Sequence, residues 1–224
     1  MPRPNDVVLV TDARPFPDDV KQELAPLLEA FRARDVPVRT GGWDDPAFDW
    51  SSAGLAVLRT PWNYHRHVED FVAWARRVPR LLNPPQVVAW NAHKTYLRDL
   101  DAAGVAVVPT EWLEREVPLD EMLERRGWKE AVLKPAVSAG SFRTKRFRRG
   151  DAPQALLRAI LAEGTAMLQP YLPAVETSGE RSLVFFGGAL SHAVKRHPPL
   201  STGLHGGVAL TPEPDELALA QAAA

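Results

Sequence analysis

The sequence predicts an α/β protein whose first part contains a parallel sheet and whose later part combines helices with antiparallel strands (α+β). Two observations support this fold class. Between Val7 and Arg77, short apolar runs typical of buried strands alternate with apolar residues at helical spacing, which predicts a parallel sheet covered by helices. Between Val132 and Lys195, strand patterns are joined by short turns, which predicts antiparallel hairpins.

The composition is that of a globular protein without a strong overall charge. Hydrophobic residues make up 45% and charged residues 25% of the chain, close to the average of globular proteins. Its length of 224 residues is enough for one large or two small domains with a core and a cleft. The net charge of −1 provides no global field that would gather nucleic acid or an anionic membrane. The lack of cysteine excludes disulfides, thiolate metal sites and cysteine nucleophiles. Met1–Asp6 lacks a signal pattern and no apolar run reaches transmembrane length, so we expect a soluble, cytoplasmic protein.

The first part of the chain should form a compact α/β domain. The expected elements, in order, are a strand at Val7–Thr11, a helix at Asp18–Ala33, strands at Val36–Arg39 and Leu55–Leu58, and a helix at Val68–Arg77. The first strand is followed by Thr11–Pro15 rather than by a glycine-rich turn, which argues against a dinucleotide site. The stiff sequence Leu82–Pro85 predicts a domain boundary.

The later part should alternate helices with strands that return beside one another. Predicted helices are Asn91–Ala102, with Asn91 as N-cap and Lys94 in the first turn, then Leu119–Arg125, Gln154–Ala162 and Asp215–Ala224. Predicted strands are Val105–Val108, Ala131–Lys134, Phe142–Arg149, Ala166–Gln169, and the hairpin Leu183–Phe186 with Leu190–Lys195. Pro198–Gly207 is expected to be a loop.

Val132–Ser141 is the stretch most suggestive of a ligand site. An apolar strand delivers Lys134 to its end, and the small-residue loop Ser138–Ser141 follows. A loop of this kind can offer several backbone N–H groups beside a lysine charge, which suits a phosphate group. The spacing matches neither a Walker loop nor a dinucleotide fingerprint, and a hairpin turn with a surface lysine is the alternative.

Two other clusters each allow a functional and a structural interpretation. Arg59–Tyr64 follows a predicted strand, at the sheet edge where ligands bind, but it also fits an aromatic plug with Arg59 paired to an acid. His65 and His67 lack partners at metal-ligand spacing, so a metal site is not expected there. The basic run Arg143–Arg149 could follow a nucleic-acid backbone, although a solvated strand face fits a neutral protein better.

These segments together resemble the ATP-grasp superfamily, in the branch of prokaryotic glutathione synthetase, ribosomal-protein glutamate ligases and the cycloserine-forming cyclo-ligase. The resemblance is carried by the order and spacing of Asn91–Leu97, Val132–Ser141, Leu168–Leu172, Gly179–Leu183 and Ser191–Pro198. It implies a Rossmann-like pre-ATP-grasp domain at residues 1–85, followed by an ATP-grasp fold of two lobes at 86–169 and 170–224, the second incomplete. The Arg59–Tyr64 cluster is most similar to the cycloserine-ligase side of the family.

The resemblance also implies roles for individual residues. Lys94 and Lys134 match the lysines that hold the nucleotide phosphates, and Ser138, Gly140 and Ser141 match the loop that closes over them. Gln169, Tyr171 and Leu172 match the hinge that reads adenine, and Glu180, or alternatively Glu176, matches the acid that binds the ribose. Lys195 and Arg196 fall where the family places cations facing the γ-phosphate or the acyl-phosphate.

The implied reaction is ATP-dependent joining of a small carboxylate to an amine through an acyl-phosphate. The implied cofactors are ATP and Mg²⁺, and the resemblance is compatible with a homo-oligomer. The family's late magnesium-binding acids have no match, because only Glu213, Asp215 and Glu216 follow Gly207. We therefore expect no metal ligands in this chain, weak nucleotide binding and no ligation by residues 1–224 alone. The alternatives are a noncatalytic nucleotide-binding relic or fragment and, less favoured, a nucleic-acid-binding module.

Overall fold

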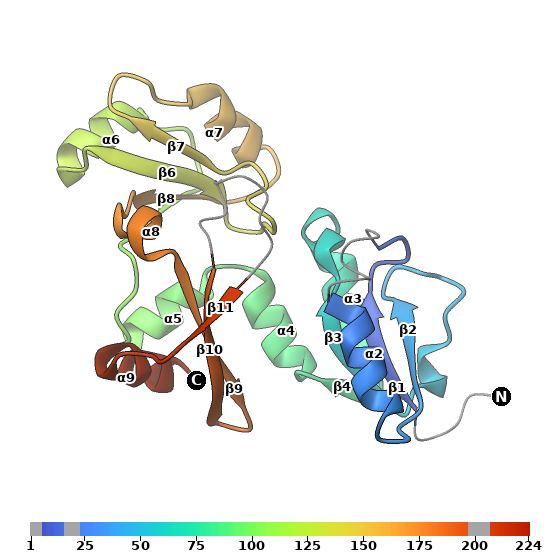
Figure 1. Ribbon diagram of the computed structural model, residues 1–224. Coiled ribbons are helices and arrows are strands. Elements are labelled where there is room, and N and C mark those ends of the chain that lie inside the picture. Colours follow the sequence, from blue (N-terminus) through green and yellow to red (C-terminus); the bar gives the residue numbers. More distant parts are fainter. Residues whose placement is uncertain (1–5, 16–22, 197–206) are drawn as a thin grey trace. The chain divides into compact units, whose positions relative to one another are not determined.

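The computed structural model describes residues 6–15, 23–196 and 207–224, which divide into two compact units, Met1–Lys94 and Thr95–Ala224 (Figure 1). Each unit has its own sheets and is described by itself. In the part of the chain that the structure describes, no helix is both long and apolar enough to cross a membrane.

The first unit contains a parallel sheet of four strands in the order β2-β1-β3-β4. Its strands are β1 (Val7–Thr11), β2 (Val38–Gly42), β3 (Leu55–Thr60) and β4 (Leu81–Leu82). All five residues of β1 are buried, as expected for a central strand with both faces covered. The parallel sheet and the predicted bounds of β1 are confirmed, whereas β2 begins two residues later than Val36 and runs on through Gly42.

Helices cover both faces of this sheet. Helix α2 (Ala25–Arg32) packs its apolar residues near Val7 and Leu9, while α3 (Val68–Arg77) and α4 (Pro85–Ala92) pack near Val10 and Ala56. The 3₁₀ turns η2 (Trp50–Ser52) and η3 (Trp62–Arg66) complete this unit. The α3 bounds agree with the prediction. Helix α2 lies within the predicted Asp18–Ala33 helix, whose first residues, 18–22, are outside the described residues.

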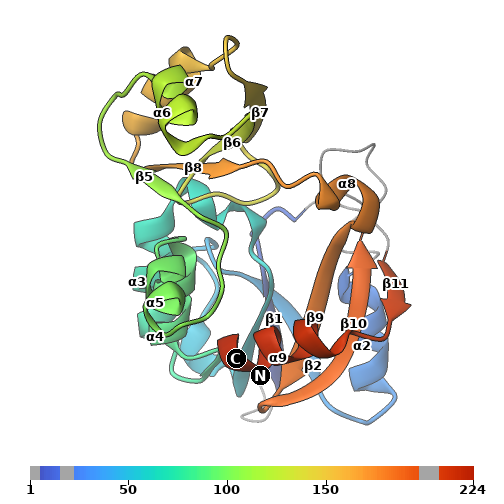
Figure 2. The same ribbon diagram turned by 90° about the vertical axis from the view of Figure 1, so that its left-hand side faces the viewer.

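The second unit begins with an antiparallel sheet in the order β5-β8-β6-β7. Its strands are β5 (Glu111–Leu113), β6 (Glu130–Pro135), β7 (Lys145–Arg148) and β8 (Ala166–Pro170). Helices α6 (Leu119–Arg126) and α7 (Gln154–Leu161) lie on one face, where their leucines meet Ala131, Leu133 and Phe147 in a core (Figure 2). The predicted hairpin of β6 and β7 is confirmed.

A second antiparallel sheet follows, in the order β11-β10-β9. Its strands are β9 (Glu180–Phe186), β10 (Ala189–Arg196) and β11 (Gly207–Leu210), and the unit also contains α5 (Tyr96–Ala102), α8 (Ala174–Ser178) and α9 (Pro214–Ala223). Gly187 and Gly188 both have positive φ, which explains the tight β9–β10 turn. The sequence did not predict β11 or α8, and most of the predicted loop Pro198–Gly207 lies outside the described residues.

Two predicted elements are wrong. The helix expected at Asn91–Ala102 is two helices, α4 and α5, so Asn91 lies near the end of α4 and is not an N-cap. Helix α4 begins earlier because Pro85, at its first position, suits a helix start. Val105–Val108 forms no strand, since the N–H of Val105 donates to the oxygen of Leu100 at 2.9 Å and closes α5 after Gly104.

Candidate functional site

The first sheet of the second unit has one face covered by helices and another that carries polar side chains. Ala131 and Leu133 point into the core beneath α6 and α7, so the alternate residues of β6 point the other way. Directly opposite residues of antiparallel strands share a face, which places Lys134 beside Met167 of β8, and Val132 beside Gln169. We call this side, away from α6 and α7, the second face of the sheet.

Lys134 stands out on the second face of the sheet. Its side chain is partly buried, and burial lowers the pKa of its ammonium group. Within the described residues, its ammonium group has no hydrogen-bond or ion-pair partner. A lysine charge withdrawn from water without a partner is unfavourable in the free protein and is suited to an anionic ligand.

The loop after Lys134 is compact and turns sharply. Gly140, Ser141 and Arg143 all have positive φ, with values of 56°, 60° and 51°. Two tight turns close it, with Phe142 N–H donating to Ala139 at 3.0 Å and Thr144 N–H donating to Ser141 at 3.0 Å. The hydroxyl of Ser138 donates to the oxygen of Pro135 at 3.4 Å. Gly140 and Ser141 are exposed at the tip, where a ligand could reach their backbone.

The end of β8 leads into a segment whose backbone donors are not all hydrogen-bonded within the described residues. Gln169 is buried and donates its side-chain amide to the Thr110 hydroxyl at 2.8 Å, so its side chain is occupied in the fold. The N–H of Tyr171 donates to the oxygen of Glu130 at 3.0 Å. The next N–H, that of Leu172, makes no hydrogen bond in the part of the chain that the structure describes.

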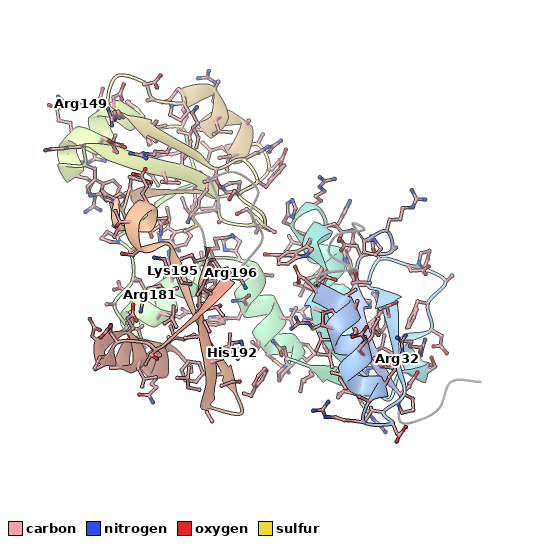
Figure 3. The ribbon with its side chains drawn as sticks, in the orientation of Figure 1. Arg32, Arg149, Arg181, His192, Lys195 and Arg196 are labelled. Atoms are coloured by element: carbon pink, nitrogen blue, oxygen red, sulfur yellow. The ribbon has the colours of Figure 1, made fainter. Side chains whose placement is uncertain are left out.

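The ends of β9 and β10 bring charged residues together on two faces. Glu180 lies opposite Arg196, and Arg181 lies opposite Lys195, so the two pairs point to different faces of the hairpin. Figure 3 labels Arg181, Lys195 and Arg196 on these strands. Arg181 forms an ion pair with Glu216 of α9, and Lys195 Nζ reaches the oxygen of Thr177 at 3.5 Å. Glu180 and Arg196 share a face, and neither side chain has an ion-pair partner within the described ranges.

Known proteins resemble this chain in both sequence and structure. Residues 7–83 match the family described as "D-cycloserine synthetase DcsG, N-terminal domain". The cycloserine biosynthesis protein DcsG of Streptomyces lavendulae is 35% identical over 201 residues, which cover 85% of this chain and 67% of that protein. A crystal structure of D-cycloserine synthetase DcsG is 32% identical with a TM-score of 0.83, and the match covers 97% of this chain and 78% of that one.

The chain belongs to the ATP-grasp superfamily. A RimK domain ATP-grasp protein from Sphaerobacter thermophilus, at 22% identity and a TM-score of 0.67, shares the fold, with 97% of this chain and 80% of that one covered. The predicted fold class, an N-terminal α/β domain followed by ATP-grasp lobes, is confirmed. The proposed bounds at residues 85 and 169 remain predictions, and α4, beyond the first of them, packs with the first unit.

Several residues that the ATP-grasp resemblance assigned to one ligand lie in the second unit. Lys134 and the Ser138, Gly140 and Ser141 loop follow each other at one end of β6. Gln169 lies in the neighbouring strand β8, and Tyr171 and Leu172 follow that strand. Lys195 and Arg196, in contrast, point to opposite faces of β10. Because adjacent strand residues alternate, one flat ligand surface cannot receive both side chains directly.

Lys94 lies in the first unit, in the turn between α4 and α5, and not in the first turn of a helix as predicted. Its charge contributes to a lowered pKa of His65. Burial is the main cause of that shift, and the charges of Arg66 and Lys94 add to it, while a hydrogen bond with the oxygen of Trp62 acts in the opposite direction.

The carboxyl edge of the first sheet carries a polar network that the sequence indicated only in part. Asn63 donates to Asp44 at 2.8 Å and accepts from Trp43 Nε1 at 2.6 Å, while the hydroxyls of Thr60 and Thr11 meet at 2.9 Å. A groove of about 540 Å³ lies beside it, lined mainly by aromatic and charged residues: Trp43, Asp44, Asp45, Phe48, Trp50, His67, Asp70, Trp74 and Arg77. In the sequence, the aromatic and acidic residues Trp43–Asp45, directly after β2, could have indicated this groove.

Most arginines of the basic run Arg143–Arg149, which includes β7, form ion pairs with acidic side chains. Arg143 pairs with Glu163 at 2.6 Å, Arg148 with Glu130 at 2.8 Å, and Arg149 with Glu124 at 3.3 Å. Arg146 pairs with both Glu130 and Glu176. These ion pairs support the interpretation of the run as a strand face whose charges serve the fold.

Proposed function

We propose that this chain acts in the ATP-dependent joining of a small carboxylate to an amine, through an acyl-phosphate. The observation that carries the proposal is the partly buried Lys134, which has no partner in the described structure and lies on the second face of the sheet beside a compact loop. The membership of the ATP-grasp superfamily supports the reaction class. No side-chain nucleophile is needed, since such catalysis rests on positioning and charge neutralisation.

The residues present fit ATP. The ammonium group of Lys134 would neutralise phosphate oxygens, and the backbone of Ser138, Gly140 and Ser141 would close over them. The unused N–H of Leu172 is free to donate to the adenine ring, whereas the side chain of Gln169 is engaged with Thr110. Bound ATP would supply the phosphoryl group that activates the carboxylate.

Charged residues of the β9–β10 hairpin would serve the rest of the nucleotide. Glu180 would accept hydrogen bonds from the ribose, and Arg196, on the same face, would neutralise charge on the phosphate side. Lys195 faces the other way and would need a change of conformation to join them. Within the described residues no group of three or more His, Asp or Glu side chains could hold a metal ion, so no step is assigned to Mg²⁺.

A binding experiment tests the assignment of Lys134. Replacing Lys134 by Ala should weaken ATP binding about ten- to a hundredfold, because a charge-assisted contact is worth roughly 1.5 to 3 kcal/mol. Lys129→Ala is the matched control, since Lys129 is exposed just before β6 and should leave affinity unchanged. Equal ATP affinity of Lys134→Ala and the parent protein would refute the phosphate role.

A second measurement tests the reaction. Phosphate release from ATP, together with a joined product detected by mass spectrometry in mixtures of amino acids and other small carboxylates and amines, would support the reaction and would overturn the expectation that residues 1–224 alone do not ligate. ATP binding without release of phosphate in any mixture would instead favour a noncatalytic nucleotide-binding protein.

A further inference from the structure

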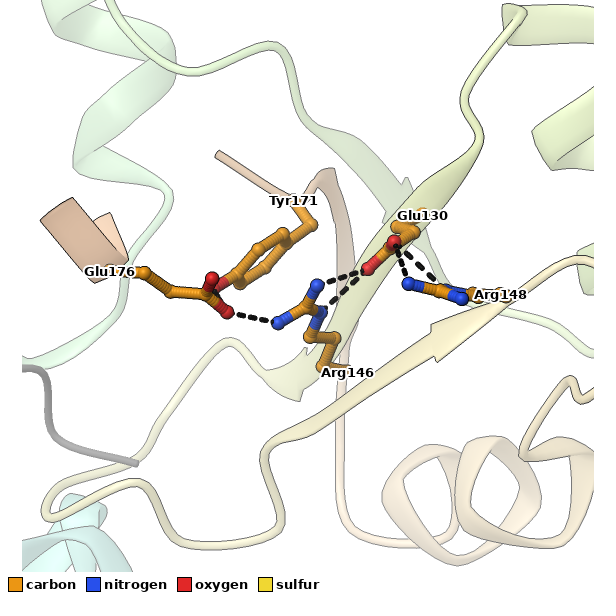
Figure 4. A network of polar contacts seen from close by, with 5 residues as sticks. All are labelled: Glu130, Arg146, Arg148, Tyr171 and Glu176. Atoms are coloured by element: carbon orange, nitrogen blue, oxygen red, sulfur yellow. Dashed lines mark hydrogen bonds and ion pairs between the residues drawn. The ribbon is translucent and has the colours of Figure 1, made fainter. Parts of the chain in front are cut away.

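Arg146 lies at the centre of a contact network in the second unit (Figure 4). Its guanidinium group donates from Nε to Glu130 Oε2 at 2.6 Å, and Nη2 lies 2.5 Å from the same oxygen. Its Nη1 forms an ion pair with Glu176, and its Cζ lies 3.6 Å from the centre of the Tyr171 ring. One planar cation therefore touches two acids and one aromatic face.

The other members of the network also bind one another. The Tyr171 hydroxyl donates to Glu176 Oε1 at 2.7 Å, and the Tyr171 N–H donates to the main-chain oxygen of Glu130 at 3.0 Å. The hydrogen bond from Tyr171, followed by that from Arg146, lowers the pKa of Glu176, so this carboxylate stays charged at neutral pH. Glu176 thus accepts from two donors and is already engaged.

The network joins segments that are distant in sequence. Glu130 and Arg146 belong to the β6–β7 hairpin, Tyr171 follows β8, and Glu176 lies in α8. Arg148 provides a useful contrast, because it also pairs with Glu130, at 2.8 Å, but its described contacts stay within the hairpin. The side chain of Arg146 therefore connects the hairpin to the segment that contains Leu172, and that of Arg148 does not.

We propose that Arg146 is a positioning residue for the nucleotide: it holds the segment Tyr171–Glu176 against the β6–β7 hairpin and so orients the free N–H of Leu172. Because Glu176 is bound by Tyr171 and Arg146 in this network, Glu180 is the acid that binds the ribose. This inference rests on the proposed function, since it assumes that the segment reads a nucleotide base.

Hydrogen exchange of the free, full-length protein tests the positioning without any nucleotide. Arg146→Met should speed exchange of the hydrogen-bonded amides of Tyr171, Val175 and Glu176 about tenfold, as expected for the loss of charge-assisted bonds at a partly exposed site. Arg146→Lys should restore little, because an ammonium group cannot make the planar, two-sided contact. Arg148→Met should leave these amides unchanged. Equal exchange in Arg146→Met and Arg148→Met would overturn the proposal.

Nucleotide titrations then test the consequence for binding. Arg146→Met and Glu176→Gln should both weaken ATP binding and reduce the preference for ATP over GTP, since the base is read by a segment that has loosened. Glu180→Gln should instead abolish the preference for ATP over 2′-deoxy-ATP while leaving the ATP-to-GTP ratio intact. If Glu176→Gln rather than Glu180→Gln abolished the ribose preference, the assignment of the two acids would be wrong.

The two experiments separate this inference from the proposed function. If the parent protein bound no nucleotide, the proposed function would fail, and hydrogen exchange would still decide whether Arg146 holds the segment. Tyr171→Phe adds an internal check, because it removes only the hydroxyl bond to Glu176 and keeps the ring beneath Arg146. Its exchange rates should fall between those of the parent and Arg146→Met.

Discussion

Among single residues, Lys134 shows how a binding group can lower the stability of the free protein. Burial lowers its pKa, so the folded state binds this proton less tightly than the unfolded state does. Stability should therefore rise as the pH increases from the folded pKa toward the ordinary lysine value. Lys134→Met should stabilise the free protein at neutral pH by roughly 1 kcal/mol, measured by urea unfolding, whereas Lys129→Met should not. Destabilisation by Lys134→Met would show that its charge is satisfied in the fold.

Asp6 makes the opposite electrostatic contribution. Burial acts to raise its pKa, but the hydrogen bond from Arg39 at 2.6 Å and that from the Gly54 N–H at 3.1 Å outweigh it and lower the pKa. This stabilisation is present above the ordinary aspartate pKa and is lost as the pH falls through the folded value. Asp6→Asn should cost about 1 to 3 kcal/mol at pH 7 and flatten the acid limb of the stability profile. An unchanged acid limb would contradict this assignment.

At the scale of elements, the Ser138–Ser141 loop should respond to nucleotide. Its tip residues Gly140 and Ser141 are exposed and offer little apolar surface to anchor it. Trypsin should cleave the free protein near Arg143 and Lys145, and saturating ATP should slow that cleavage. The exposed Arg125 and Arg126 at the end of α6 provide a control site whose cleavage should not change. Cleavage near the loop at equal rates with and without ATP would count against a closing loop.

The loop also contains a local conformational cost. Ser141 has a φ of 60°, in the left-handed region that glycine adopts without steric penalty. Ser141→Gly should therefore relieve backbone strain, while Gly140→Ala, at a φ of 56°, should add it, each by about 1 kcal/mol. Thermal unfolding of the two variants should show shifts of opposite sign. Shifts of the same sign would mean that the loop leaves this conformation in solution.

At the scale of the whole molecule, the extent of the first unit can be tested with fragments. Val88 of α4 is buried against the core that contains Phe71 and Trp74 of α3. A fragment of residues 1–94 should therefore be more stable than one of residues 1–84 by about 1.5 to 3 kcal/mol, the value of burying one such side chain. Urea unfolding followed by circular dichroism measures the difference. Equal stability would place the boundary at Pro85, as the sequence alone suggested.

The sequence by itself determined the elements whose pattern is local. The sequence correctly predicted β1, α3 and the strand pairs of two hairpins. Each of these elements has a repeating pattern of apolar residues within one short segment, and that pattern can be recognised without knowing the fold. The family also followed from the order of short motifs. The division of Asn91–Ala102 into α4 and α5 was missed, since both halves carry apolar residues that suit a single helix.

Only the tertiary structure decided how distant residues share their contacts. The resemblance gave Glu180 as the ribose acid with Glu176 as the alternative, and the structure shows what separates them: the register of β6 and β7 places Arg146 where it engages Glu176, while Glu180 lies beside Arg196. The same register separates Arg148, which stays within the hairpin, from Arg146, which reaches α8. Strand pairing and side-chain contacts between residues far apart in the chain carry no local periodic signal, so the structure was needed to assign them.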